Sequence, residues 1–321
     1  MKKTLFTLLI LSTVVGIMSC RKSGSMPNIK QYDDQQIQSY ISANGISGMK
    51  RDTVGGDTTG IYYQIIQQGT GAQFDYPDSL FFTYTLKSFD GLYNNADTVV
   101  DHYNGLLGHT APKGLTTALH DVVKYKGTKV RILIPSHLAY GLAGAGSGSK
   151  TIVNGRIAGN QCLDYTLYVV PDPAAYDDQV LLNYMAANNL SGYTKLNTGP
   201  AAGMWYKITV PATGNLITYN SYVSAYYTGQ LMNNSFFTDV YSPTVVAPAT
   251  TTTLGSFTDL SALTPGFLNG LFLLGKGNGT ISLLIPSRLA FRSSSSSADA
   301  GTIPANACVR FEVQVTDVTT N

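Results

Sequence analysis

The chain has 321 residues, which leaves room for two domains of ordinary size. Only 12% of the residues are charged and the formal net charge is +2, whereas 44% are hydrophobic and tyrosine (21) and glycine (32) are abundant. This composition argues against a disordered tail, a coiled coil and a nucleic-acid binder, because each of these needs many charged side chains.

The N-terminus has the features of a secretory signal. Lys2 and Lys3 precede an apolar run from Leu5 to Met18, which is shorter than a membrane span but suits the hydrophobic region of a signal peptide. The run ends at Ile17-Met18-Ser19-Cys20, which resembles the lipobox of bacterial lipoproteins. The resemblance implies a signal peptide at 1–19 and a lipid on Cys20. An uncleaved signal anchor and a plain cleaved signal are the alternatives.

Cleavage before Cys20 has consequences for charge and location. Residues 1–19 hold two lysines and no acid, so the mature chain has 19 basic and 19 acidic residues, and its charge names no partner. Residues 20–31 begin with a polar, low-complexity stretch and are expected to form a tether. We expect a soluble protein held by its lipid in the cell envelope, by default on the periplasmic face of an outer membrane.

Four sequence blocks occur twice in the same order, and this repetition indicates a tandem duplication of a unit of about 145 residues. The pairs are YDDQQIQSYISANGISGM (32–49) with YDDQVLLNYMAANNLSGY (176–193), GIYY (60–63) with GMWY (203–206), LIPSHLAYG (133–141) with LIPSRLAFR (284–292), and IAGNQCLDYTLYV (157–169) with IPANACVRFEVQV (303–315). We therefore place two domains at 32–171 and 172–321.

Each unit is predicted to open with a short amphipathic helix, capped by Asp33-Asp34 or Asp177-Asp178. The helix is expected to pack on its own domain, with a dimerisation helix as the alternative. Later segments rich in Tyr, Thr, Val and Ile alternate with period two and predict antiparallel strands. These strands lie at 80–86, 130–134, 163–169, 221–227, 281–285 and 309–315, with helical segments at 114–125 and 265–274.

Two cysteines occupy the same position in the two units. Cys162 and Cys308 both follow the repeated Asn-containing turn and precede the last strand. Equivalent strand positions in separate domains are poorly placed to bond to each other. Both are therefore interpreted as small buried apolar residues rather than as a disulfide or a metal site.

The second unit contains an ordered series of motifs: YYTG at 226–229, Phe237, PGFLNGL at 265–271, LIPSRLAF at 284–291, IPANA at 303–307 and FEV at 311–313. The series resembles the FKBP-type peptidyl-prolyl cis-trans isomerases over roughly 203–317, and the first unit matches less completely over roughly 60–170. The resemblance implies an α+β fold with two FKBP-like domains, each a twisted antiparallel sheet wrapped around a short helix. It implies neither a cofactor nor a metal.

The chemistry of this family suits such residues. Rotation about an X-Pro bond has a barrier of about 18 to 20 kcal/mol because it breaks amide resonance. The twisted bond is less polar than the planar amide, so a dry apolar pocket favours it without a nucleophile. Aromatic walls would hold the proline ring, and a polar group at the rim would hold a carbonyl.

In the second unit the resemblance implies catalytic roles for Tyr227, Phe237, Phe267, Phe291 and Phe311, and substrate-binding roles for Leu263, Thr264 and Ile303. The sequence departs from the family at three places. Phe267 replaces a tryptophan, Thr238 replaces an aspartate although Asp239 follows, and Phe291 lacks a hydroxyl that bonds a substrate carbonyl in the family. The missing hydrogen bond is worth about 0.5 to 1.5 kcal/mol, so reduced activity is expected.

In the first unit the corresponding substrate-binding residues are Tyr84, Leu115, Tyr140, Ile157 and Tyr165. Tyr140 keeps the hydroxyl, but Leu115 stands in the tryptophan position and Asn94-Asn95 fall where Phe-Asp is expected. A leucine floor and a polar wall would grip proline poorly. The first unit is therefore expected to hold unfolded client, with ordinary sheet core as the alternative role of its aromatic residues.

Other signals are weaker. The loop before the last strand is enlarged at 142–153 and again from Ser293, which predicts a flap that either adapts to protein substrates or is a tolerated insertion. The four histidines, at 102, 109, 120 and 137, lack metal-site spacing and are interpreted as solvated surface residues. No hydrolase, nucleotide-binding or CxxC motif is present.

The leading hypothesis is a peptidyl-prolyl isomerase that helps exported proteins fold in the bacterial envelope, with activity mainly in the second unit. Its partners would be proline-containing or unfolded polypeptides and, through Cys20, the membrane, with no nucleic acid. The alternative is a non-catalytic envelope lipoprotein that binds proteins or peptides with two degenerate domains. An immunoglobulin-like adhesin is a third possibility, and it requires 114–125 and 265–274 to be strands.

Overall fold

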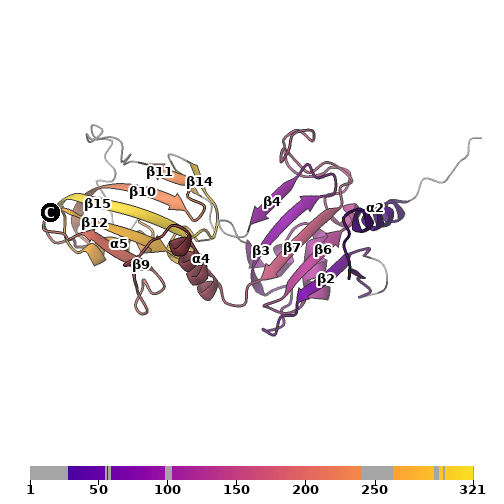
Figure 1. Ribbon diagram of the computed structural model, residues 1–321, viewed down its shortest axis with the longest axis horizontal. Coiled ribbons are helices and arrows are strands. Elements are labelled where there is room, and N and C mark those ends of the chain that lie inside the picture. Colours follow the sequence, from indigo (N-terminus) through magenta and orange to yellow (C-terminus); the bar gives the residue numbers. More distant parts are fainter. Residues whose placement is uncertain are drawn as a thin grey trace, which may run out of the picture.

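A computed structural model describes residues 28–54, 56, 59–97, 103–239, 263–292, 296–298 and 301–320. It is a mixed α+β structure in which two units lie side by side, each built on an antiparallel sheet (Figure 1). The predicted signal peptide, Cys20 and residues 20–27 of the predicted tether lie outside the described residues. Within the described ranges, every helix is too short or too polar to cross a bilayer.

The first unit is a seven-stranded sheet with the order β1-β2-β6-β7-β3-β4, with β5 also paired to β3. Its helices are α2 and α3, and η2 continues α3 as a single wider turn. The bounds are α2 (Ile29–Ala43), β1 (Lys50–Arg51), β2 (Tyr62–Gln67), β3 (Ser79–Ser88), β4 (Asn94–Asp97), β5 (Tyr103–Leu106), η1 (Leu107–His109), α3 (Lys113–Ala118), η2 (Leu119–Val123), β6 (Lys129–Ile134), η3 (Ser136–Leu138) and β7 (Leu163–Val169).

The second unit is a six-stranded sheet with the order β11-β10-β15-β12-β9-β8, beside a two-stranded sheet of β13 and β14. The order of its six strands repeats that of the first sheet, which agrees with the duplication seen in the sequence. The bounds are α4 (Pro173–Ala187), β8 (Thr194–Lys195), β9 (Trp205–Val210), β10 (Ser221–Leu231), β11 (Phe236–Asp239), α5 (Pro265–Leu274), β12 (Gly279–Ile285), η5 (Ser287–Leu289), β13 (Ser296–Ala298), β14 (Gly301–Ile303) and β15 (Val309–Thr320).

The structure confirms the predicted type of secondary structure, strand or helix, for each of the predicted segments. All six period-two segments are strands, because alternation places one set of apolar side chains on the inner face of each sheet. The segment 265–274 is helix α5, and 114–125 holds most of α3 and all of η2. The immunoglobulin-like alternative is therefore wrong, since it required both segments to be strands.

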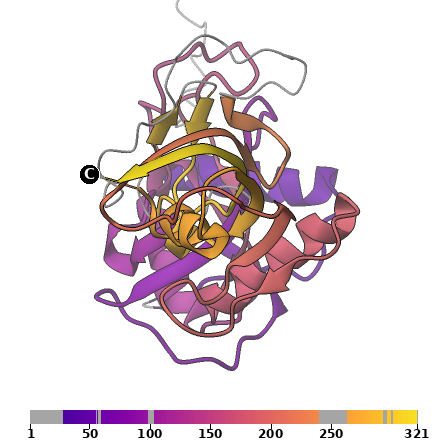
Figure 2. The same cartoon turned by 90° about the vertical axis from the view of Figure 1, so that its left-hand side faces the viewer.

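A glycine lets each inner helix approach its sheet closely. A Cβ atom on Gly114 would lie 2.4 Å from Ile134 Cγ2, and one on Gly266 would lie 2.3 Å from Ile285 Cγ2. Any other residue would push α3 or α5 away from the strand beneath it. Figure 2 shows the result in the second unit, where β15 curves over α5.

The N-terminal helices α2 and α4 pack on the outer faces of their own sheets, as predicted. Ile37 of α2 is fully buried with Leu133 and Cys162, and Leu181 of α4 is fully buried in a cluster with Leu284 and Cys308. Both cysteines are free, and burial raises the pKa of Cys162 to about 12. In the described part of the chain, no group of three or more His, Cys, Asp or Glu side chains is placed to hold a metal ion.

The prediction for the helix caps is wrong. The N-caps are Asn28 and Asp172, and α2 begins at Ile29, so the last residues of the predicted tether are helical. Asp33 and Asp177 lie within the helices and are 1% exposed. A sequence pattern does not distinguish an acid that caps a helix from one a turn later that faces the sheet, because both precede the same apolar residues.

Candidate functional site

A cavity of about 330 Å³ opens on the inner side of the first sheet. All five positions predicted for the first unit line it: β3 provides Tyr84, β7 provides Tyr165, α3 provides Leu115, and the segment after η3 provides Tyr140 and Ile157. These residues are far apart in the sequence. The structure brings them together because β3 and β7 are paired neighbours and α3 lies beneath them.

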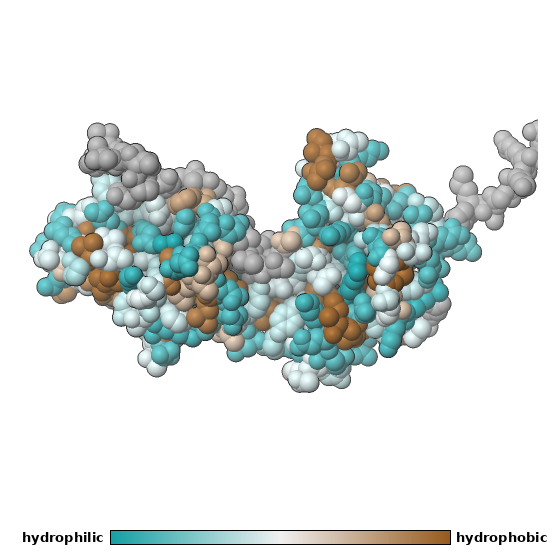
Figure 3. Space-filling view, viewed as in Figure 1, coloured by the Kyte–Doolittle hydropathy of each residue, from teal (hydrophilic) through white to brown (hydrophobic). Residues whose placement is uncertain are grey.

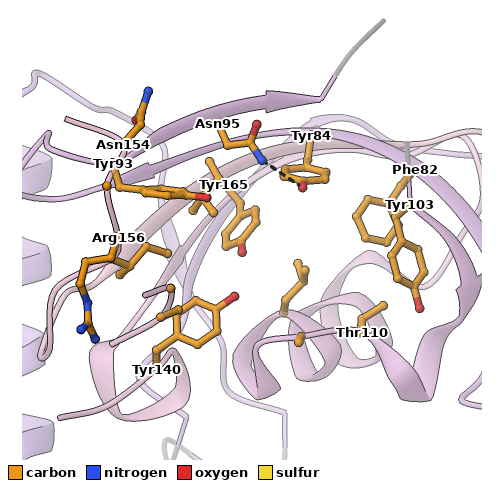
Figure 4. Close-up of a pocket in the computed structure, with 17 residues that line it drawn as sticks. Phe82, Tyr84, Tyr93, Asn95, Tyr103, Thr110, Tyr140, Asn154, Arg156 and Tyr165 are labelled. Carbon is orange, nitrogen blue, oxygen red and sulfur yellow. Dashed lines mark hydrogen bonds between the residues drawn. The ribbon is translucent and has the colours of Figure 1, made fainter. Parts of the chain in front are cut away.

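The hydroxyl groups of Tyr140 and Tyr165 point into this cavity (Figure 4). Burial raises the pKa of Tyr140, an effect opposed by a hydrogen bond with Tyr165. Burial also raises the pKa of Tyr165 well above its usual value, and the nearby Tyr140 raises it further. Both phenols are therefore protonated at neutral pH. Tyr165 donates its O–H to Tyr140, as the opposite effects of their hydrogen bond on the two pKa values indicate, so the O–H of Tyr140 is the one left to donate to a carbonyl oxygen.

Asn95 stands at the polar position that the sequence marked as a departure from the family. It pairs with Leu86 in the β3–β4 register and lines the cavity. Its Nδ2 donates a hydrogen bond to the Tyr84 hydroxyl at 3.4 Å (Figure 4). A neutral amide thus occupies this wall, and the described residues that line the cavity include no carboxylate.

Sequence reasoning missed several residues of the lining. Phe82 was within reach, because it alternates with Tyr84 on β3 and so faces the same side of the sheet. Leu86 also lies on β3, and Tyr103 is the first residue of β5. Loops and turns, where no period indicates the direction of a side chain, provide Tyr93, Thr110, Asn154 and Arg156.

The predicted flap of the first unit covers one side of the cavity. Ala145 and Ile157 form an isolated bridge, and Asn154 ties the loop to the start of β4 by accepting from Asn94 N at 2.7 Å. The loop also has an apolar tip, visible on the space-filling surface (Figure 3). Leu142, Ile152 and Val153 are 84%, 63% and 67% exposed.

In the second unit the predicted aromatic residues contact one another at steep angles. The ring centroids of Phe267 and Phe311 are 5.0 Å apart, those of Phe237 and Phe311 are 5.5 Å apart, and those of Tyr227 and Phe267 are 5.3 Å apart. Phe291 lies at the edge of the cluster, with its ring centroid 6.0 Å from that of Phe237. Such edge-to-face contacts stabilise the cluster beyond simple burial.

The other predicted residues of the second unit surround these rings. Ile303 is 1% exposed and Leu263 packs against the same core. Thr264 is the N-cap of α5, and its buried hydroxyl has no hydrogen-bond partner within the described part of the chain. Thr238 and Asp239 lie in β11.

Two pairs of equivalent positions in the two units are buried to the same degree. Tyr165 and Phe311 are 3% and 4% exposed, and Leu115 and Phe267 are also 3% and 4% exposed. The duplication therefore preserved the positions while their chemistry diverged. Hydroxyl groups are concentrated in the first unit and phenylalanine rings in the second.

One histidine contradicts the prediction of solvated surface residues. The side chain of His137 is only 16% exposed, and its Nδ1 lies 2.7 Å from a carboxylate oxygen of the buried Asp33. His109 is exposed, and His120 is partly exposed beside Asp75 and Asp121. His102 lies outside the described residues. The reason is tertiary: Asp33 comes from a helix that docks beside the turn of His137.

No protein family matches the chain in a family scan, and no curated protein matches it. Several solved structures are similar to the chain. The three FKBP domains of wheat FKBP73 are 18% identical over 81% of this chain and 95% of that chain, with a TM-score of 0.34. FkpA from Escherichia coli is 24% identical over 46% of this chain and 61% of that chain, with a TM-score of 0.34.

A peptidyl-prolyl cis-trans isomerase from Pseudomonas syringae pv. tomato is 20% identical over 46% of this chain and 98% of that chain, also with a TM-score of 0.34. The structural neighbours are thus FKBP-type proteins, some of them with several domains. At these values the likeness concerns the fold and says nothing about activity. A functional assignment has to come from the site itself.

Proposed function

We propose that this protein is a peptidyl-prolyl cis-trans isomerase in which both units bind proline-containing segments. The observation that supports the proposal most is the convergence of Tyr84, Leu115, Tyr140, Ile157 and Tyr165 on one cavity. These residues were selected through the resemblance to the isomerase family, from motifs scattered over about 80 residues of this chain. Ordinary core residues would not need to border an open volume.

The cavity offers what bond rotation requires. Phe82, Leu115 and Ile157 provide apolar surface for a proline ring, and the Tyr140 hydroxyl provides a donor for a neighbouring carbonyl. A hydrogen bond to that carbonyl anchors one side of the rotating bond while the ring turns in the apolar part. This arrangement lowers the barrier only if it fits the twisted amide better than the planar one.

The two units would contribute differently. The sequence assigned more aromatic pocket residues to the second unit, which was the reason to expect most activity there, but Phe291 lacks a donor hydroxyl. In the structure six aromatic rings line the cavity of the first unit. The first unit has the donor and a smaller floor at Leu115. We assign the first unit a share of the turnover, in addition to the role of holding client.

The test is isomerisation of an X-Pro peptide by the full chain, measured by exchange NMR so that no protease is needed. Tyr140→Phe should lower the first unit's contribution to the isomerisation rate by up to about tenfold. Phe291→Tyr should raise the share due to the second unit. A wild-type chain that gives no acceleration over the uncatalysed reaction, at any peptide tested, rejects the proposal.

A non-catalytic binding protein is the second candidate, and one observation favours it. Asn95 places an amide on the cavity wall and uses it to hold the Tyr84 hydroxyl, which makes this wall polar. A polar wall weakens the preference for the less polar twisted amide. Saturable binding of proline peptides without acceleration, with binding lost in Leu115→Asp, would identify this function.

The lipid anchor and the envelope location are further parts of the proposal. They rest on the lipobox-like sequence that ends at Cys20 and on the apolar run before it. The clients would then be exported polypeptides. Expression in a bacterial host with an alkyne-labelled fatty acid should label the wild-type chain and not Cys20→Ser. Equal labelling of both chains, or labelling of neither, would rule out the anchor.

A further inference from the structure

Each N-terminal helix directs one buried carboxylate to the turn that follows a central strand, η3 after β6 and η5 after β12. In the first unit this residue is Asp33 of α2, which is 1% exposed. Asp33 Oδ1 accepts from Ser136 Oγ at 2.6 Å, and Oδ2 accepts from His137 N at 3.0 Å. Oδ2 also lies 2.7 Å from His137 Nδ1. Every one of these partners belongs to η3.

The turn η3 controls the backbone on both sides of Tyr140. Ala139 N donates to Ser136 O at 3.1 Å, and Gly141 N donates to the same oxygen at 2.9 Å. Tyr140 is thus held between two residues that are bonded to Ser136. Asp33 binds the side chain of Ser136 and the main-chain N–H of His137. The position of Asp33 therefore determines the position of the backbone that carries Tyr140.

The second unit repeats this arrangement. Asp177 of α4 is 1% exposed, and its Oδ2 accepts from Ser287 N at 3.0 Å and from Ser287 Oγ at 2.8 Å. Ala290 N and Arg292 N both donate to Ser287 O, at 3.1 and 3.2 Å, so they bracket Phe291. The residue after the serine differs between the units, His137 in one and Arg288 in the other. The acid-to-serine link is the part that both units share.

A buried carboxylate is costly unless several donors satisfy it. Here the N–H and O–H donors of Asp33 come from one turn, and the Cys162 thiol, with its Sγ 3.8 Å from Asp33 Oδ1, is a weaker donor from outside that turn. Packing of α2 on the sheet needs only the apolar residues around Ile37. The carboxylate therefore fixes the position of the turn, and the apolar residues provide the buried surface that docks the helix. A displacement of about 1 Å at a group that contacts a reacting bond lowers rates strongly.

We infer that Asp33 is a positioning residue for Tyr140, and that Asp177 has the same role for Phe291. The N-terminal helix of each unit is then part of the machinery around the pocket and not only a cover for the outer face. The effect on rate rests on the proposed isomerase function, whereas the effect on the orientation of Tyr140 does not.

The chain offers a matched control. Asp164 is also a buried acid, 6% exposed, and it too links α2 to the sheet, since Tyr40 Oη donates to it at 3.0 Å. It binds Arg131 at 3.0 and 2.6 Å and makes no hydrogen bond to η3 in the described structure. Asp164→Asn should therefore weaken helix docking without moving the turn.

The kinetic test is a double-mutant cycle in the full chain. In the part of the isomerisation rate that the first unit contributes, Asp33→Asn should cause about the same loss as Tyr140→Phe, roughly three- to tenfold. A Phe267→Asp background, which disrupts the second unit's cluster, isolates that part. The double variant should be no slower than Tyr140→Phe alone, while Asp164→Asn stays within about twofold of wild type. Multiplied effects in the double variant, or an equal loss in Asp164→Asn, would show a merely structural role.

A second readout is independent of any peptide. 3-Fluorotyrosine placed at position 140 should give one ¹⁹F resonance in the wild type and in Asp164→Asn, and a shifted or broadened one in Asp33→Asn. An unchanged resonance in Asp33→Asn overturns the inference, even if the protein proves not to be an isomerase. If circular dichroism shows that Asp33→Asn does not fold, Ser136→Ala removes one of the three contacts and is read in the same way.

Discussion

In the first unit the residues around the cavity end in hydroxyl groups at Tyr140 and Tyr165, whereas in the second unit the equivalent residues are Phe291 and Phe311. The supporting elements are the same: paired strands above, an inner helix with a glycine in its first turn, and an acid-linked turn at the side. The contrast teaches that this framework specifies positions and burial, while the chemistry at each position is free to change.

The largest expected effect is a difference in stability between the two units when a buried ring is removed from each. Phe311→Ala should cost about 3 to 5 kcal/mol of unfolding free energy, since the ring contacts Tyr227, Phe237 and Phe267. Tyr165→Ala should cost less, because the ring of Tyr165 borders a cavity and has fewer neighbours to lose. Urea denaturation followed by the single tryptophan, Trp205, reports on the second unit, and circular dichroism reports on both. Equal losses would mean that the two sites are packed alike.

The next effect should be the same in both units, since it tests the shared framework. Gly114→Ala and Gly266→Ala should each cost about 1 to 3 kcal/mol, because the new methyl group would overlap a side chain of the strand beneath. The exposed Lys113→Ala, next to Gly114, should change stability by no more than about 0.5 kcal/mol and serves as the control. A loss in one unit alone would show that the two inner helices are held differently.

A smaller change in stability is expected when a hydroxyl group is added at Phe311 or removed from Tyr165. Phe311→Tyr should cost about 1 to 3 kcal/mol, because it buries a hydroxyl with no tyrosine at position 291 to meet it. Tyr165→Phe should cost about 1 kcal/mol or less, since Tyr140 can turn its hydroxyl to the cavity. In the double variant Phe311→Tyr with Phe291→Tyr, part of the loss should be recovered. Thermal unfolding measures all four chains, and no recovery would argue that the two positions do not contact.

The smallest change in stability should come from Phe291→Tyr alone. The ring is only partly buried at the edge of the cluster, so the added hydroxyl reaches solvent and the unfolding free energy should change by about 0.5 kcal/mol or less. The isomerisation rate of the full chain should nevertheless rise, by up to about tenfold in the second unit. A rate that does not move would remove Phe291 from the site.

Much of the fold was accessible from the chain itself. The period of two in segments such as Val130–Ile134 reports which side chains face the core, and that is a property of the strand alone. The first-unit residues were predicted through the resemblance of their motifs to the FKBP-type isomerases, and the structure places all five around one cavity. Phe82 was omitted although the period of two applied to it.

The cavity residues that come from loops could not be predicted from the sequence. Tyr93 and Arg156 reach the cavity from loops whose course depends on the bonds between Asn94, Asn154 and Leu92, and such bonds join residues about 60 positions apart. Loops have no period, so nothing local shows where their side chains point.

The sequence by itself determined the duplication, the strands and the inner helices, because repeats and periods are local and survive any packing. The five positions around the first-unit cavity followed from the resemblance of its motifs to a known family. Only the tertiary structure decided that Asp33 and Asp177 are buried anchors rather than helix caps, and that His137 is paired rather than solvated. Both depend on a helix docking against a turn more than 100 residues away, and the direction of that docking is set by long-range packing.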